Sequence, residues 1–173
     1  ITMEFKEVDN IVLVIGKTEG HIDQSLFARN ILDEKNGPPP EVNLFNEKNN
    51  GLTTLKLIKE NLIESCHDVS LGGIIVAISK MCLKGKKGIK INQLKGLINK
   101  FEYFFGEDQA RYLVEIQKEN LPKVDKILKE NSVHYDELGT VIDENIEFSD
   151  EIKLSIDDLE KTYKNWLRKY MIN

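Results

Sequence analysis

The stretch "CHDVSLGGIIVAISKM", residues 66–81, places three polar side chains and two glycines directly before an apolar run. Residues 71–83 are apolar nearly all round, which predicts a helix that is deeply buried. Asp68 or Ser70 would cap its first turn, and the Gly72–Gly73 pair would let it pack tightly against a neighbour. The stretch therefore predicts a buried helix that begins at a polar turn.

The same turn is also a candidate ligand site. His67, Asp68, Ser70 and both glycines cluster more densely than a helix cap requires. A carboxylate at a helix start often holds Mg²⁺ or orients an amide of a ligand, so Asp68 is a candidate metal ligand. Cys66 and His67 are adjacent in a strand-like stretch and point to opposite faces, which argues against a nucleophile–base pair. The residues alone leave both interpretations open.

Strand-like and helical segments alternate along the rest of the sequence. Alternating or continuous apolar patterns predict strands in residues 1–8, 11–15, 89–92, 110–116, 133–142 and 146–155, the last two as a pair about a turn. Apolar residues at steps of three and four predict helices in residues 24–32, 43–65, 93–101, 121–132 and 155–171. This pattern predicts an α+β fold in which residues 1–173 form one domain, with helices packed on a mixed β-sheet.

Two of these helices carry large apolar side chains at helical spacing. In the first, the apolar positions are Leu44, Leu52, Leu55, Ile58, Leu62 and Ile63. In the last, Tyr163, Trp166, Leu167 and Tyr170 form a stripe that predicts core packing, and Ser155 is the expected N-cap.

The composition argues against several classes of protein. The chain is 40% hydrophobic and carries a formal net charge of −5, which supports a folded core and argues against a nucleic-acid partner. Cys66 and Cys82 fit no metal-binding spacing and are expected to be buried free thiols of a cytoplasmic protein. No apolar run has the length needed to cross a membrane, and no signal peptide is visible. Because Ile1 already lies in a strand-like run, the chain is expected to be a piece of a longer protein.

A second polar segment, "GKTEGHIDQS" at residues 16–25, joins a predicted strand to a predicted helix. It is not a P-loop, because Ile11 stands where that motif needs glycine. Backbone amides at the helix start could hold an anion, with Gly20, His21, Gln24 and Ser25 as the candidate loop residues. The alternative is a capped helix start, with Asp23 or Ser25 as the cap.

The third polar segment is "FGEDQARY", residues 105–112. Glu107, Asp108 and Gln109 precede a predicted internal strand, and Arg111 lies within the strand pattern. A buried arginine is costly unless it is paired, so Arg111 is expected to face a carboxylate or a bound anion. The alternative is a polar turn with an exposed arginine at the sheet edge.

Taken together, these segments resemble a known family. "GHIDQSLFAR", "PPPEVNLFNEKNNG", "CHDVSLGG", "FGEDQARYLVE" and the final "WLRKYM" occur in the order found in the C-terminal part of phosphoribosylformylglycinamidine synthases of the small-subunit type. The likeness covers nearly the whole chain. It implies a domain like the C-terminal domain of aminoimidazole ribonucleotide synthetase, the last of four domains, with residues 1–10 as a strand connecting it to the preceding nucleotide-binding domain.

The resemblance also implies a function for the complete protein. It would be an ATP-dependent carbon–nitrogen ligase of purine biosynthesis that uses Mg²⁺ and takes ammonia from a glutaminase partner. Formylglycinamide ribonucleotide would be converted to the amidine. The catalytic histidine and the active ATP site of the family lie in segments absent from this chain, so no catalytic residue is expected here and the fragment alone is expected to be inactive.

Site residues carry over only as candidates for a nucleotide site or a domain interface. They are His67, Asp68, Ser70, Gly72, Gly73, Glu107, Asp108, Gln109 and Arg111. One departure is Leu71, where the family usually has aspartate. The lost carboxylate favours a degenerate pocket, and the leucine could extend the buried helix face. The alternatives for function are another synthetase or kinase of the same fold group, or a stand-alone nucleotide-binding module.

Overall fold

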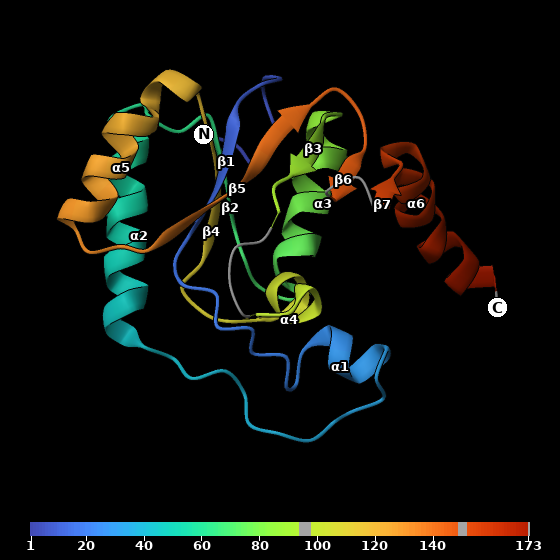
Figure 1. Cartoon of the computed structure of the whole chain (residues 1–173). Coiled ribbons are helices and arrows are strands. Elements are labelled where there is room, and N and C mark those ends of the chain that lie inside the picture. Colours follow the sequence, from blue (N-terminus) through green and yellow to red (C-terminus); the bar gives the residue numbers. More distant parts are fainter. Residues whose placement is uncertain (94–97, 149–151, 173) are drawn as a thin grey trace.

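The computed structural model describes residues 1–93, 98–148 and 152–172. Strands and helices interleave along them (Figure 1). In chain order the elements are β1 (Ile11–Ile15), α1 (Leu26–Asn30), α2 (Leu44–Lys59), β2 (Ser65–Asp68), α3 (Gly73–Gly85), β3 (Gly88–Ile91), α4 (Lys100–Phe105), β4 (Tyr112–Ile116), a 3₁₀ turn (Lys118–Asn120), α5 (Leu121–Glu130), β5 (Tyr135–Ile142), β6 (Ile146–Phe148), β7 (Ile152–Leu154) and α6 (Ile156–Ile172).

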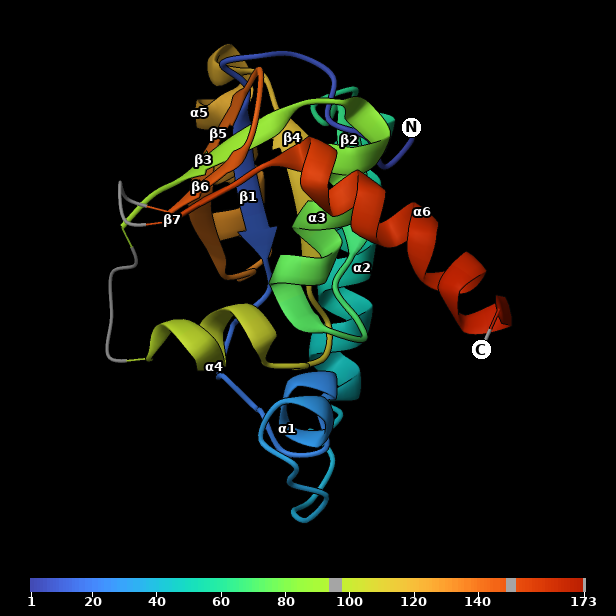
Figure 2. The ribbon, with the colours of Figure 1, turned by 90° about the vertical axis from the view of Figure 1, so that its right-hand side faces the viewer.

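The strands of the described chain form one mixed sheet in the order β2-β4-β1-β5-β3-β6-β7. Neighbouring strands are antiparallel except β3 and β6, which are parallel. Helices α2 and α5 cover one face, and α3 and α4 cover the other, with α6 beside α3 (Figures 1 and 2). The predicted α+β fold, one domain with helices on a mixed sheet, is confirmed.

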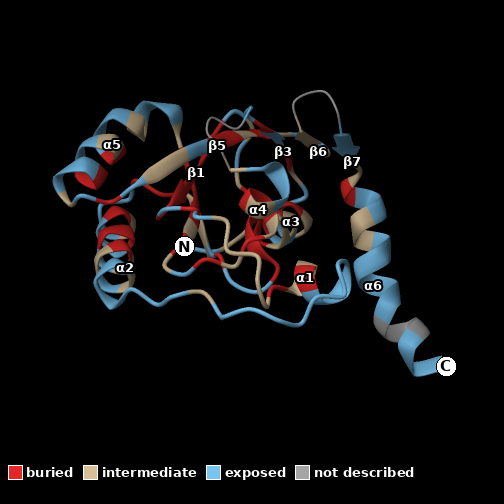
Figure 3. Cartoon of the chain, turned by 60° about the horizontal axis from the view of Figure 1, so that its bottom comes forward, coloured by how far each residue is buried: buried red, intermediate tan, exposed pale blue. Residues whose placement is uncertain are grey.

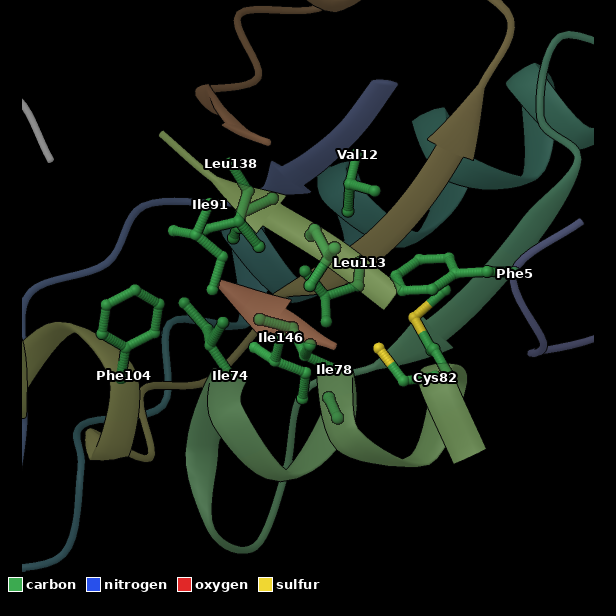
Figure 4. Packing of buried hydrophobic residues seen from close by; sticks show 14 of the residues in the cluster. Phe5, Val12, Ile74, Ile78, Cys82, Ile91, Phe104, Leu113, Leu138 and Ile146 are labelled. Atoms are coloured by element: carbon green, nitrogen blue, oxygen red, sulfur yellow. The ribbon is translucent and has the colours of Figure 1, made fainter. Parts of the chain in front are cut away.

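The position of β1 between two layers of helices explains why its sequence is apolar without interruption. Successive side chains of a strand point to opposite faces. Val12 and Val14 pack toward α3 (Figure 4 shows Val12 there), whereas Ile11, Leu13 and Ile15 pack toward α2 and α5. Both faces are covered by helices, so every position of this strand is buried.

The α3 side of the sheet holds the larger core. Helix α3 presents Ile74, Ile78 and Cys82 to it (Figure 4). The helix predicted from residues 71–83 is confirmed as deeply buried on this side. Cys66 and Cys82 are both free, as expected, but only Cys82 is buried and Cys66 is half-buried. Burial raises the pKa of the Cys66 thiol to about 11 and that of Cys82 further.

Residues 1–10 do not form the predicted strand. They make one isolated parallel bridge, between Thr2 and Ser65, and are otherwise irregular. The segment is fixed instead by the fully buried Glu115 of β4. This carboxylate accepts hydrogen bonds from the backbone N–H groups of Lys6 and Glu7, from Asn10 Nδ2 and from Ser65 Oγ, at 2.8–3.1 Å. The backbone N–H groups of this segment are therefore paired with a buried carboxylate rather than with a neighbouring strand.

Two other local predictions differ from the structure. Residues 133–142 and 146–155 do not pair with each other about a turn, because β3 lies between β5 and β6. The helix predicted at 93–101 begins only at Lys100, and residues 94–97 of that prediction lie outside the described chain.

Of the two apolar stripes predicted from helical spacing, the one in residues 155–171 faces solvent and the one in residues 43–65 is divided. The predicted 43–65 helix ends at Lys59; Ile58 packs against the core, and Leu62 and Ile63 are buried after the helix ends. In α2, Leu44, Leu52 and Leu55 are exposed, and the buried face is made by Asn50, Thr53, Thr54 and Leu57. In α6, Tyr163, Trp166 and Tyr170 are exposed rather than part of the core, and the side chain of Leu167 lies outside the description. The helical spacing of apolar residues correctly predicted both helices. Ser155 is the N-cap of α6, as predicted, and its Oγ accepts a hydrogen bond from Asp158 N. No helix in the described part of the chain has the length and apolar character needed to cross a membrane.

Candidate functional site

The three polar segments found in the sequence meet at one end of the sheet. Strands β1 and β2 end there and β4 begins there, so their loops converge (Figure 1, lower part). Two acidic side chains of the 105–112 segment, Glu107 and Asp108, link this segment to the other two.

Glu107 joins the starts of two helices. Its Oε1 atom accepts hydrogen bonds from the backbone N–H of Leu26 at 2.7 Å and of Gly72 at 2.9 Å. The unpaired N–H groups of a first helical turn favour a carboxylate, so one side chain stabilises both α1 and α3. In α1, Ser25 is the N-cap, as one of the two predicted alternatives had it, and its Oγ accepts from Ala28 N.

The predicted caps of α3 are wrong. Neither Asp68 nor Ser70 caps it; the N-cap is Gly72, with φ of 84° and no side-chain cap bond, and the Glu107 carboxylate takes that place from a distant segment. Leu71 does not extend the buried helix face either, because it precedes the helix and is exposed. A cap supplied by tertiary structure leaves no local signal in the sequence.

Gly73 permits the close approach of α3 to the third segment. A Cβ at this position would lie 2.6 Å from the carbonyl oxygen of Phe104 and 2.7 Å from that of Gly106, and φ is 70°. We expect Gly73→Ala to lower the free energy of unfolding by about 2 to 3 kcal/mol, because both the contact and the backbone conformation disfavour a side chain.

Urea unfolding followed by far-UV circular dichroism measures this effect. Gly51→Ala is the matched control, since a Cβ there would meet only the Tyr112 hydroxyl at 3.2 Å. Equal stability of the two variants would show that the 104–106 backbone moves aside without cost.

Asp108 organises the loop after β1. Its carboxylate accepts hydrogen bonds from the backbone N–H groups of Glu19, Gly20 and His21 at 3.0–3.2 Å. It also faces the buried Arg111, whose Nη1 lies 3.5 Å from Asp108 Oδ2. The expectation that Arg111 faces a carboxylate is confirmed, and the alternative of an edge-exposed arginine is wrong.

The Arg111 side chain is fully buried and well bonded. Its guanidinium donates to the carbonyl oxygens of Gly106 at 2.7 Å and Asp108 at 3.1 Å, and to Thr18 Oγ1 at 3.3 Å. Burial lowers the pKa of this guanidinium, and the Asp108 carboxylate opposes that shift. The pair is therefore an internal support of the loops, without a free donor aimed at solvent.

Asp108 and the two residues after it form one wall of a pocket of about 860 Å³. Its lining comes from the 17–23 loop, from Pro38–Glu41, from the start of α2 and from Asp108–Ala110. Four carboxylates line it (Glu19, Asp23, Glu41 and Asp108), against one lysine, Lys17, which pairs with Glu19 at 2.7 Å. The pocket is thus polar and acidic, and it is better suited to groups that donate hydrogen bonds than to a phosphate chain.

The structure separates the candidate residues. Gly20, His21, Asp108 and Gln109 line the pocket, whereas Gln24 does not. His21 Nε2 lies 3.0 Å from the carbonyl oxygen of Pro38, and Gln24 Nε2 donates to the carbonyl oxygens of Lys35 and Gly37. These two side chains tie the proline loop to the first polar segment.

Sequence reasoning missed the contribution of α2. Asn43, Asn46 and Asn50 all line the pocket. Asn43 caps α2, Asn50 Nδ2 donates to the carbonyl oxygen of Ala110, and the Asn46 side chain makes no hydrogen bond within the described residues. Spacings of three and four residues place these amides on one side of a helix, so the signal was present in the sequence.

His67 and Asp68 lie at the end of β2, outside the pocket lining. His67 Nδ1 is 3.2 Å from Asp68 Oδ1, and the Asp68 side chain is 67% exposed. Within the described residues no three His, Cys, Asp or Glu side chains gather in a way that could hold a metal ion. Asp68 as a metal ligand stays a prediction, without co-ligands in this part of the chain. The side chain of Cys66 packs on the α2 side of the sheet, in line with the argument against a Cys66–His67 pair.

Comparisons with known proteins show the family of this chain. Residues 7–150 match the family model described as "AIR synthase related protein, C-terminal domain". The chain is 65% identical over 173 residues to the phosphoribosylformylglycinamidine synthase subunit PurL of Pelagibacter ubique, covering all of this chain and 24% of that protein. The Bartonella bacilliformis protein of the same name is 33% identical, with 100% and 23% covered. The chain therefore spans about a quarter of the length of these relatives.

Solved structures show the same fold. Thermotoga maritima PurL complexed with FGAR superposes with a TM-score of 0.75 at 18% identity, covering 92% of this chain and 29% of that one. The structure of PurLQS from the same organism gives a TM-score of 0.67, again at 18% identity, over 90% of this chain and 26% of that one. At such identities the likeness concerns the fold alone.

Proposed function

Because this chain belongs to the AIR synthase-related family, as its C-terminal domain, we propose that it is the C-terminal domain of a phosphoribosylformylglycinamidine synthase. The complete enzyme would transfer the γ-phosphoryl group of ATP to the glycinamide carbonyl oxygen of formylglycinamide ribonucleotide. Ammonia would then displace this oxygen as phosphate and leave the amidine, with ADP and phosphate as the other products. The 65% identity to a relative of that name over the whole of this chain supports the assignment.

The role proposed for this domain is to shape a binding wall. The observation that carries this is the bonding of Asp108, which fixes the 16–25 loop against the 105–112 segment at one pocket. Glu107 joins the start of α1 to the 66–73 turn, which itself lies outside the pocket lining. Preorganised loops keep their polar groups in place without loss of conformational entropy on binding. Of the candidates, Gly20, His21 and Gln109 would face a ligand, and Gly72, Gly73, Glu107 and Arg111 would hold the loops that carry them.

Mg²⁺ and ATP do not fit the residues of this domain. Asp68 is exposed and has no second ligand in the described chain, and the pocket presents carboxylates where a polyphosphate would need cations. No step of the reaction is therefore assigned to this domain. In the proposed enzyme, ATP and Mg²⁺ would be held by the domains that precede it.

The partners follow from the same proposal. A glutaminase subunit or domain would supply the ammonia, and the remaining domains of the synthase would complete the enzyme. The presence of a PurLQS assembly among the structures of similar fold supports a protein that works with other subunits. Because purine synthesis uses soluble substrates and the cysteines are free, the proposed location is the cytoplasm.

The complete reading frame, made with and without Ile1–Asn173, tests the proposal. We expect the full-length protein to release ADP only when ammonia and formylglycinamide ribonucleotide are both present, and we expect the truncated protein to lose this activity while remaining folded. Circular dichroism and gel filtration check the fold. Release of ADP that ignores formylglycinamide ribonucleotide would overturn the assignment and favour a related synthetase or kinase.

A further inference from the structure

Helix α2 buries Leu57 against the sheet but turns four other large apolar side chains away from it. Leu44, Phe45, Leu52 and Leu55 are 77%, 74%, 56% and 42% exposed. At 100° per residue these four positions fall within an arc of about 100°, so they share one side of the helix, and Lys48 and Lys59 fall within the same arc. We call these four residues the α2 outer face.

The inner side of α2 is unusually polar. Asn50, Thr53 and Thr54 are buried there beside Leu57. Thr54 Oγ1 is buried without a hydrogen-bond partner in the described chain. A helix at a protein surface normally buries its apolar stripe and exposes its polar one. Figure 3 shows that the solvent side of α2 is exposed along the helix, so the described chain leaves its more apolar side uncovered.

Three lysines lie on or beside the α2 outer face. Lys48, Lys56 and Lys59 are exposed, and they form no ion pair within the described residues. By the same helical geometry they lie between or beside the apolar side chains. A surface that fits this face would therefore be apolar, with carboxylates positioned near the lysines.

The start of the chain is held close to this helix. Thr2 bridges to Ser65, and Cys66 N donates to the Thr2 carbonyl oxygen at 3.0 Å, only a few residues after α2 ends. The Glu115 carboxylate fixes the backbone at Lys6 and Glu7. Any chain that precedes Ile1 thus enters next to β2, as Figure 2 also shows, and near the carboxyl end of α2.

We propose that the α2 outer face is covered, in the complete protein, by the part of the same chain that precedes Ile1. The occupant is an apolar surface with Asp or Glu side chains opposite Lys48, Lys56 and Lys59. This chain spans about a quarter of its relatives, so their chains are long enough to contain such a segment. The inference depends on the chain being part of a longer protein and not on that protein's activity.

Thiol labelling of the full-length protein tests the coverage. Leu52→Cys, Leu55→Cys and Phe45→Cys are made singly, and iodoacetamide labelling is followed peptide by peptide by mass spectrometry. Lys126→Cys on α5 is the control, because its side chain is 75% exposed. We expect the α2 sites to react at least about tenfold more slowly than the control, since labelling requires the covering surface to open. Equal rates at all four sites would overturn the proposal.

Carbodiimide crosslinking identifies the occupant. A mixture of ¹⁴N- and ¹⁵N-labelled full-length protein distinguishes links within one chain from links between copies. We expect Lys48, Lys56 or Lys59 to join Asp or Glu residues preceding Ile1, with both peptides carrying the same label. Links between differently labelled copies, together with thiol labelling of the α2 sites that becomes faster on dilution, would assign the face to a second copy and overturn the proposal. Neither the labelling rates nor the crosslinks depend on catalytic activity. A protein that lacked the proposed activity could therefore still show the covered face, so the failure of one proposal can be told from the failure of the other.

Discussion

Arg111→Met is expected to lower the free energy of unfolding by about 3 to 5 kcal/mol, because it leaves the Asp108 carboxylate without its buried cation. The guanidinium also satisfies the carbonyl oxygens of Gly106 and Asp108 and contacts Thr18. Methionine fills similar volume but donates no hydrogen bond, so these acceptors would remain buried and unpaired. Urea unfolding of the 173-residue chain measures the loss.

Two further variants separate charge from geometry. Arg111→Lys keeps the charge but lacks the planar fork, so it should recover only part of the stability. Lys126→Met on the surface of α5 is the control for the change of residue type and should stay within about 0.5 kcal/mol of the parent protein. If Arg111→Met were as stable as that control, the bonding of the 16–25 loop to the 105–112 segment through Asp108 and Arg111 would not stabilise the fold.

Glu115→Gln is the second substitution for which a large loss is expected, about 3 to 5 kcal/mol. The Glu115 carboxylate accepts hydrogen bonds from two backbone N–H groups, an asparagine amide and a serine hydroxyl. An amide in its place would direct its own N–H₂ group at one or more of these donors and leave them unpaired. Because the donors belong largely to residues 6–10, the loss should appear first as detachment of the N-terminal segment.

Hydrogen exchange resolves that detachment. The amides of Lys6 and Glu7 should lose protection in Glu115→Gln, while the amides of β1 keep theirs at low denaturant. The matched control is Glu119→Gln, because Glu119 is exposed and lies four residues further along the chain. Unchanged protection at Lys6 and Glu7 would mean that Phe5, buried in the core, holds the segment by itself.

The candidate site could be predicted in part. The three polar segments were recognisable because glycines and polar side chains interrupt apolar patterns at residues 16–25, 66–73 and 105–112. Their meeting at one end of the sheet depends on strand order, which residue patterns do not encode. Asn43, Asn46 and Asn50 show the same limit, since helical spacing aligns them but only the fold places them against the 108–110 turn.

The sequence by itself determined where β1, β4, α3, α5 and α6 lie, because uninterrupted apolar runs and helical periodicity are local properties of the chain. It also predicted that a buried Arg111 would face a carboxylate or a bound anion, because the cost of burying a charge does not depend on the fold. Only the tertiary structure decided that β3 separates β5 from β6, that Glu107 from a distant segment replaces a local cap at α3, and that α2 exposes Leu44, Leu52 and Leu55. These outcomes depend on which elements become neighbours, and that choice is made by the packing of the whole domain rather than by any short segment.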